Sequence, residues 1–177
     1  MTLQKYKALV PNHYTRAKFL NIWMCRVLAH QSIIFAKTNN YTMIPEGNSI
    51  EAIRVREQII REFYKEWKEK NPSQRKYNLS LKEYINIRMV SIVETSEHAA
   101  KSYLSTLAVL QLDSILTGAR KVSIKKSKPG NANQKPFERI MIMEYELFGI
   151  GKVKMTVGVR RRTQEKVQYC ITAISNE

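Results

Sequence analysis

The sequence is poor in cysteine, which argues against two classes of small protein. Only Cys25 and Cys170 occur among its 177 residues, far apart and without a CxxC pair. Neither a zinc site nor a disulfide framework is therefore indicated. Because cysteines that stay reduced are typical of the cell interior, we expect a cytoplasmic protein.

Long hydrophobic runs and familiar enzyme motifs are also missing. The opening stretch MTLQKYKALVPNHY lacks the apolar core of a signal peptide, and no apolar run approaches the roughly 20 residues of a membrane helix. No HExxH, GxxxxGKS/T or GxSxG motif occurs. We therefore expect no membrane association, no metal and no cofactor.

Acidic residues are scarce relative to basic ones. Thirty Lys and Arg face fifteen Asp and Glu, which gives a net charge of +15. A field of that sign attracts polyanions. Nucleic acid is the first candidate, an anionic membrane surface the second and an acidic protein the third, while a protein that simply runs basic is the alternative. Residues 120–166 hold thirteen Lys or Arg against four Glu, so the charge is concentrated in the C-terminal half.

The first half of the chain has the apolar spacing of helices. Residues 19–28 predict one helix, with Thr15 as its N-cap. Asn48 or Ser49 begins a second, and the pattern ends at Asn71, which precedes a proline. Ser80 begins a third pattern with a capping box. Its apolar residues are Leu81, Tyr84, Ile85, Met89, Ile92 and Val93.

This third pattern continues to Ile115 and is too long for one helix of a compact domain. Unbroken, it would cover about 37 residues and about 55 Å. We therefore expect a break near the sequence ETSEH, with Thr95 or Ser96 capping the second piece. Gly118 would end that piece, in the usual place for a helix-stopping glycine.

After Gly118 the apolar period changes from about 3.6 to 2, which is typical of strands. Short turns separate four such segments, so they predict an antiparallel meander. The fold class is therefore α+β. We expect a helical N-terminal module over residues 1–93. Residues 94–177 would form a long helix packed on a C-terminal four-stranded antiparallel meander sheet.

The third predicted strand has one apolar and one basic side. The apolar side is formed by Val153, Met155, Val157 and Val159. The residues between them point to the opposite, basic side, since successive side chains of a strand point to opposite sides. The polar side is either merely solvated or binds phosphate. The candidate nucleic-acid-binding residues are Arg160, Arg161, Arg162, Lys125, Lys126 and Thr172.

A candidate acid–base residue, His98, lies at the start of the predicted helix piece. The positive end of the helix dipole there disfavours an imidazolium, and a neutral histidine can act as a general base. The alternative is a surface histidine in a cap region, and His13 and His30 are interpreted as structural. Metal-free RNA cleavage also needs cationic donors for the phosphorane and an acid for the leaving 5′-oxygen. The catalytic candidates are His98, Lys154, Thr156 and Tyr169.

Several runs resemble a known family: EHAAKSYLSTLAVLQLDSILTGARKV, then FERIMIMEY, then GKVKMTVGVRRRTQEKVQYCITAI. Over residues 94–176 they look like phage- and mobile-element-borne relatives of the barnase, EndoU, colicin and RelE nuclease superfamily. The resemblance implies a metal-independent RNase or tRNase, often a toxin. It carries the histidine role to His98, the strand positions to Lys154 and Thr156, and the last-strand polar positions to Tyr169 and Thr172.

Three functions remain open from the sequence. The first is a metal-independent endoribonuclease-like domain, active or vestigial, of the toxin or mobile-element kind. The second is a non-catalytic basic protein that binds RNA or other nucleic acid as an electrostatic platform. The third is an interaction module for an acidic protein partner such as an antitoxin.

Overall fold

The computed structural model describes residues 44–128 and 130–174. The first predicted helix, with Thr15, Cys25 and two of the three histidines, lies outside these residues. Residues Met43–Glu177 form one compact unit. Among the described residues no helix is both long enough and apolar enough to span a membrane.

Helix α3 (Ile50–Lys70) begins and ends where the sequence predicts. The Ser49 side chain accepts a hydrogen bond from the Ala52 amide at 3.1 Å, which makes Ser49 the N-cap. Asn71 is the C-cap, and it precedes a proline that cannot continue the helix. The buried stripe holds Ala52, Arg56, Ile59, Ile60, Phe63, Tyr64 and Trp67.

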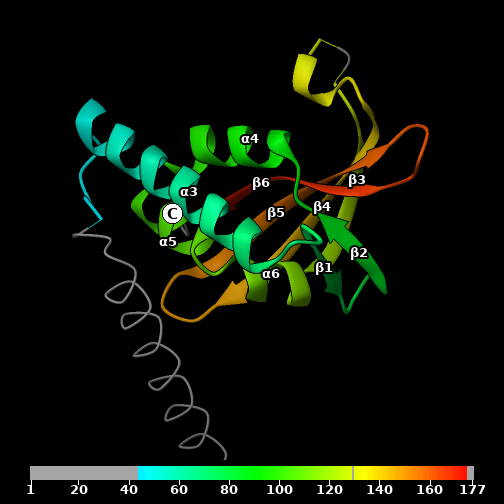
Figure 1. The fold of residues 1–177 in the computed structure, drawn as a ribbon, viewed down its shortest axis with the longest axis horizontal. Coiled ribbons are helices and arrows are strands. Elements are labelled where there is room, and N and C mark those ends of the chain that lie inside the picture. Colours follow the sequence, from blue (N-terminus) through cyan, green and yellow to red (C-terminus); the bar gives the residue numbers. More distant parts are fainter. Residues whose placement is uncertain (1–43, 129, 175–177) are drawn as a thin grey trace, which may run out of the picture. The chain divides into compact units, whose positions relative to one another are not determined.

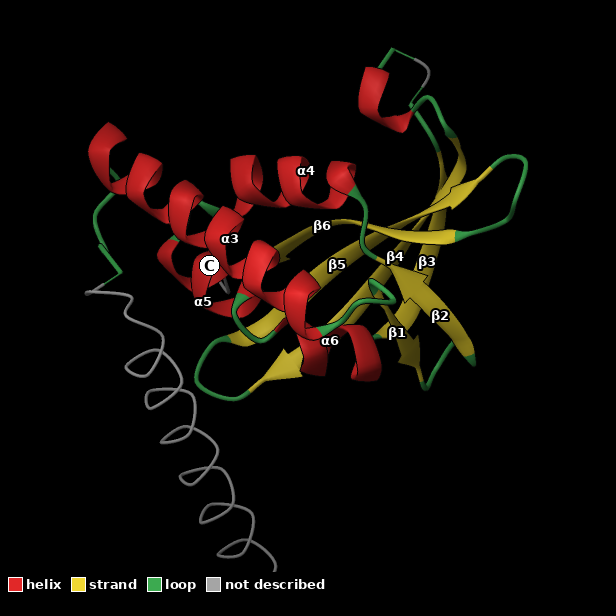
Figure 2. Cartoon of the chain, in the orientation of Figure 1, coloured by secondary structure: helices red, strands yellow, loops and turns green. Residues whose placement is uncertain are grey.

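The strands form one six-stranded mixed sheet (Figures 1 and 2). Their order across the sheet is β1-β2-β6-β5-β4-β3. The elements are β1 (Arg75–Asn78), β2 (Glu83–Asn86), β3 (Arg120–Lys126), β4 (Phe137–Leu147), β5 (Gly151–Arg160) and β6 (Lys166–Ala173). Strands β3 to β6 are sequential and antiparallel, whereas β2 pairs with β6 in parallel.

The prediction of a four-stranded antiparallel sheet is therefore wrong, because the sheet has six strands and one of its pairings is parallel. The antiparallel meander from β3 to β6 is present, but a hairpin from the first half of the chain extends it. The residues of β2 are those that we expected in a helix, because Tyr84 and Ile85 fit helical spacing. In the structure Tyr84 is exposed, Ile85 and Ile87 are buried, and this alternation is that of a strand.

The hairpin of β1 and β2 is held by one buried side chain. Asn78 donates through Nδ2 to the carbonyls of Leu116 at 2.7 Å and Ala119 at 3.0 Å. Its Oδ1 accepts from the amides of Ser80 at 3.1 Å and Leu81 at 2.8 Å. Asn78 thus closes the hairpin turn and joins it to residues 116–119, about 40 positions later in the chain, a tertiary contact that short-range patterns do not reveal.

The long helical pattern is broken twice, and not where we predicted. It forms α4 (Met89–Ala99), α5 (Tyr103–Val109) and α6 (Leu112–Gly118). Ser102 caps α5 by accepting from the Ser105 amide at 3.3 Å. Thr95 and Ser96 do not cap a helix; they are buried inside α4, which crosses the predicted boundary between residues 93 and 94.

Helices α4 and α5 cover the free edge of β6. Strand β2 pairs with β6 only at Lys166 and Val167, so the remaining backbone groups on that edge need other partners. The Ser91 hydroxyl of α4 donates to the Gln168 carbonyl at 2.5 Å. The Ser105 hydroxyl of α5 accepts from the Ala173 amide at 2.9 Å.

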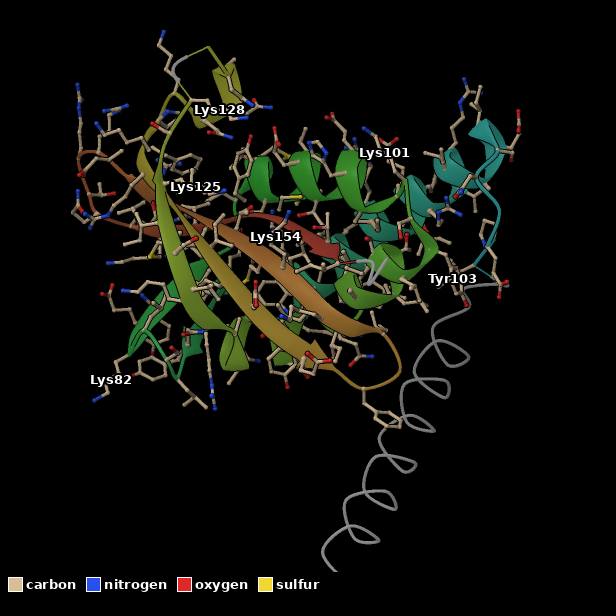
Figure 3. All side chains as sticks on the ribbon, turned by 180° about the vertical axis from the view of Figure 1, so that it is seen from behind. Lys82, Lys101, Tyr103, Lys125, Lys128 and Lys154 are labelled. Carbon is tan, nitrogen blue, oxygen red and sulfur yellow. The ribbon has the colours of Figure 1, made fainter. Side chains whose placement is uncertain are left out.

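The core lies between the sheet and the helices α3, α5 and α6, which Figure 1 shows on one side of the strands. We call this side of the sheet the helix face. Met143, Val153, Met155 and Ile171 are fully buried there. The opposite side is the open face, and Figure 3 shows Lys154 on it. The alternation predicted for β5 is thereby confirmed, since Val157 and Val159 are also fully buried.

Candidate nucleic-acid interface

The β5–β6 turn and the β3–β4 loop meet at one end of the sheet. Arg161 joins them: its amide donates to the Pro136 carbonyl at 3.2 Å, and its guanidinium lies 3.4 Å from both the Lys135 carbonyl and the Ser127 hydroxyl. This contact brings basic residues from four segments together. We call the cluster the basic end: Lys125, Lys126, Lys128, Lys135, Arg139, Arg160, Arg161 and Arg162.

Two carboxylates lie within the basic end and neutralise part of its charge. Glu165 lies 3.4 Å from Arg160 and also binds Arg88 at 2.5 Å. Glu138 lies 3.9 Å from Arg139. Within the described part of the chain, Lys125, Lys126 and Arg162 make no salt bridge. These three exposed cations are therefore available to a phosphate, whereas Arg160 is partly engaged with Glu165.

Two of the predicted catalytic residues, His98 and Tyr169, lie beside one buried carboxylate, Glu94 of α4. Its side chain accepts a hydrogen bond from Asn133 Nδ2 at 2.5 Å. His98 Nε2 lies 3.6 Å from the other oxygen. The side chain of Glu94 is only 6% exposed, against 52% for His98, so the pair lies where the interior meets solvent.

Tyr169 points toward this carboxylate because of a bulge in β6. Thr156 pairs with Cys170 and Val157 with Gln168, which leaves Tyr169 as the extra residue. Its ring packs edge-on against Phe137, with centroids 5.9 Å apart. Burial raises the pKa of the Tyr169 hydroxyl, and Glu94 raises it further. Because this hydroxyl is buried and its pKa is raised, it is poorly placed to protonate a substrate.

His98 lies in the last turn of α4, not in the first turn of a helix. The argument for a neutral imidazole from the positive end of the helix dipole is therefore wrong, because the negative end lies there. The reason is that α4 starts seven or eight residues earlier than expected, since its N-cap is Arg88 and not Thr95 or Ser96. His98 instead contacts the carboxylate of Glu94, which the sequence analysis did not predict.

Lys154 and the two threonines lie on the open face, across β5 and β6. Lys154 is exposed and pairs across the strands with Thr172. Thr156 is half-buried, and its hydroxyl donates to the Cys170 carbonyl at 3.2 Å. The structure thus brings Lys154, Thr156 and Tyr169 around Cys170, but the Thr156 hydroxyl is already committed to the backbone.

Two residues of this cluster were not among the predicted site residues. Glu94 stands four residues before His98, a spacing that places both on one helical face and could have indicated the pair. Cys170 has its thiol pKa raised to about 12 by burial and by Glu94, against an opposing effect of Lys154. A thiol with so high a pKa is not a nucleophile at neutral pH.

No group of three or more His, Cys, Asp or Glu side chains that could hold a metal ion occurs within residues 44–128 and 130–174. The basic end and the Glu94 cluster are connected, because Asn133 belongs to the same loop as Lys128 and Lys135. The arrangement offers cations to a polyanion and places one carboxylate–histidine pair beside them.

Comparison with known proteins identifies no relative. No protein-family model matches the chain, and no curated protein and no solved structure matches it either. The structure therefore defines an α+β protein with a six-stranded mixed sheet, and its resemblance to the nuclease superfamily stays a prediction.

Proposed function

We propose that the protein binds nucleic acid, RNA above all, through phosphate contacts at the basic end. The observation that carries the proposal is the contact of Arg161 with Ser127 and Lys135, which unites the cations of two separate loops. Arginine and lysine that replace condensed counterions supply most of the sequence-independent affinity for nucleic acid. A guanidinium can also contact one phosphate through two donors.

The test compares two triple variants of equal charge in the full chain. Lys125→Ala, Lys126→Ala and Arg162→Ala remove exposed cations of the basic end, while Arg54→Ala, Lys65→Ala and Lys70→Ala remove exposed cations of α3. Binding of fluorescein-labelled RNA is followed by anisotropy. The first variant is expected to bind roughly tenfold to a hundredfold more weakly at about 0.1 M salt, because about three phosphate contacts are lost. Equal losses in both variants would count against the proposal.

A second candidate function is metal-independent RNA cleavage, and the Glu94–His98 contact at 3.6 Å favours it. His98 would accept the proton of a ribose 2′-hydroxyl as that oxygen attacks phosphorus. Lys154 would stabilise the charge on the phosphorane and protonate the departing 5′-oxygen, leaving a cyclic phosphate. When the product leaves, His98 would release the proton it gained to solvent, and Lys154 would take up a proton from solvent.

The cleavage candidate is tested with labelled RNA in excess chelator. His98→Ala and Lys154→Ala are each expected to lower the cleavage rate by about a hundredfold, the usual range for one acid–base or charge-stabilising group. Lys101→Ala, an exposed cation just beyond α4, is the matched control and should cleave normally. Intact RNA with the unsubstituted protein would end this candidate and leave the binding proposal standing.

A further inference from the structure

The β1–β2 hairpin carries two exposed tyrosines that no function described so far uses. Tyr77 and Tyr84 are cross-strand partners, with ring centroids 5.4 Å apart and planes at 73°. They are 43% and 49% exposed. The Arg75 guanidinium carbon lies 4.5 Å from the centre of the Tyr84 ring. We call these three residues the tyrosine hairpin.

The tyrosine hairpin is rigidly held, although it lies at the edge of the sheet. Asn78, directly after Tyr77, makes its hydrogen bonds to the end of α6 while fully buried. Farther along, the Ile87 amide donates to the Gln74 carbonyl at 2.8 Å and closes the open end of the hairpin. The rings are therefore presented on a fixed backbone, and a ligand that stacks on them loses little further conformational entropy.

The tyrosine hairpin lies on the same side of the sheet as part of the basic end. A single row of paired residues crosses all six strands and shares one side of the sheet, since paired residues point the same way. The row is Lys125, Ile140, Gly158, Val167, Asn86 and Arg75. Five strand spacings make it about 24 Å long. Tyr77 and Tyr84 are each two residues from this row, so they project from the same side.

The charges around the rings also fit a polyanion. Lys82 in the hairpin turn is exposed (Figure 3), and Arg75 adds a second cation. The one carboxylate of the hairpin strands, Glu83, is paired with Lys166. An aromatic face flanked by cations is the combination that proteins use to hold unpaired bases and their phosphates.

We propose that the tyrosine hairpin stacks bases of a single-stranded nucleic acid whose phosphates contact the basic end. This inference rests on the proposed function and adds that the ligand is single-stranded. Bases inside a duplex already stack on each other, so the rings of a rigid hairpin do not reach their faces. A cross-strand aromatic pair also stabilises a hairpin by itself, and the experiment separates the two roles.

The experiment uses the full chain with a labelled RNA of about 12 nucleotides, either single-stranded or annealed to its complement. Tyr77→Leu with Tyr84→Leu is expected to weaken single-strand binding at least about fivefold, the lower limit for one lost stacking contact. Duplex binding should change less than about twofold, because phosphate contacts remain. Tyr77→Phe with Tyr84→Phe keeps the rings and should bind like the unsubstituted chain, and Tyr103→Leu on α5 is the distant control.

Two results would overturn the inference: an equal loss for both RNAs, or no loss in the leucine variant. A second readout does not depend on the stability of that variant. Tyr84→Trp places an indole on the hairpin, and its fluorescence should be quenched by the single strand and not by the duplex. Absence of this difference contradicts stacking. Failure of the unsubstituted chain to bind either RNA would instead show that the proposed function itself is wrong.

Discussion

At the scale of single residues, Cys170 shows how burial and charge set the chemistry of this surface. Its thiol hydrogen lies near the Glu94 carbonyl, at a sulfur–oxygen distance of 3.7 Å, on the covered edge of β6. Burial and the Glu94 charge raise its pKa to about 12, and Lys154 only partly offsets them. The folded protein therefore keeps the neutral thiol over the whole physiological range.

This raised pKa predicts a loss of stability at alkaline pH. Below the ordinary thiol pKa both states keep the proton, and the stabilising contribution is fully present. As pH rises above that value, the unfolded thiol ionises while the folded one does not, so the free energy of unfolding falls. Between pH 7 and 9.5 the free energy of unfolding of the unsubstituted chain should fall by about 1 kcal/mol more than that of Cys170→Val. Urea unfolding at several pH values measures it, and identical pH profiles would contradict the assignment.

The residue-level prediction was partly right, for physical reasons that differ between positions. Strand alternation correctly placed Lys154 and Val153 on opposite sides, because a period of two needs no tertiary information. Alternation alone does not place Tyr169, since a bulge in β6 shifts the alternation there and no local pattern in the sequence indicates a bulge. The helix-dipole argument at His98 was wrong, because that argument depends on where α4 begins.

At the scale of elements, α4 takes the place of a neighbouring strand along most of β6. Ser91 makes two hydrogen bonds there: it accepts from the Arg88 amide at 2.9 Å and donates to the Gln168 carbonyl. Gln168 in turn donates to Thr95 at 2.8 Å and accepts from Tyr64 at 2.9 Å. A polar network thus replaces the missing ladder inside the core.

The covering role of α4 predicts that Ser91→Ala is destabilising. The substitution leaves the part-buried Arg88 amide and the buried Gln168 carbonyl without their partner, so the free energy of unfolding should fall by about 1–3 kcal/mol. Urea unfolding followed by far-UV circular dichroism measures the change. Ser114→Ala, at an exposed position of α6, is the control and should stay within about 0.5 kcal/mol. A shift no larger than that of the control would show that the edge of β6 does not depend on Ser91.

The elements themselves were predictable to different extents. Helix α3 and the four strands after Gly118 have strong periodicity and clear end signals, and the sequence indicated them. Strands β1 and β2 are four residues each, too short for periodicity to distinguish them from a helix. The parallel pairing of β2 with β6 joins residues about 80 positions apart, so no local signal could reveal it.

At the scale of the whole molecule, the described residues separate their apolar and basic surfaces. Helices α3, α5 and α6 cover one side of the sheet, and the other side carries Lys154 and, from the basic end, Lys125 (Figures 1 and 3). Lys125, Lys126 and Arg162 are exposed, and no carboxylate among the described residues pairs with them. Part of the excess positive charge of the described residues is therefore presented to solvent at a defined place, and a basic composition alone does not require that.

The claim that the basic end binds phosphates is tested most directly by the salt dependence of RNA binding. It is measured for the unsubstituted chain and for the two triple-alanine variants. Each phosphate contact contributes about 0.7 to the slope of log affinity against log salt for a single strand. The account predicts that loss of Lys125, Lys126 and Arg162 makes the slope shallower by about 2, while the α3 variant keeps the slope of the unsubstituted chain. Identical slopes for all three proteins would contradict it.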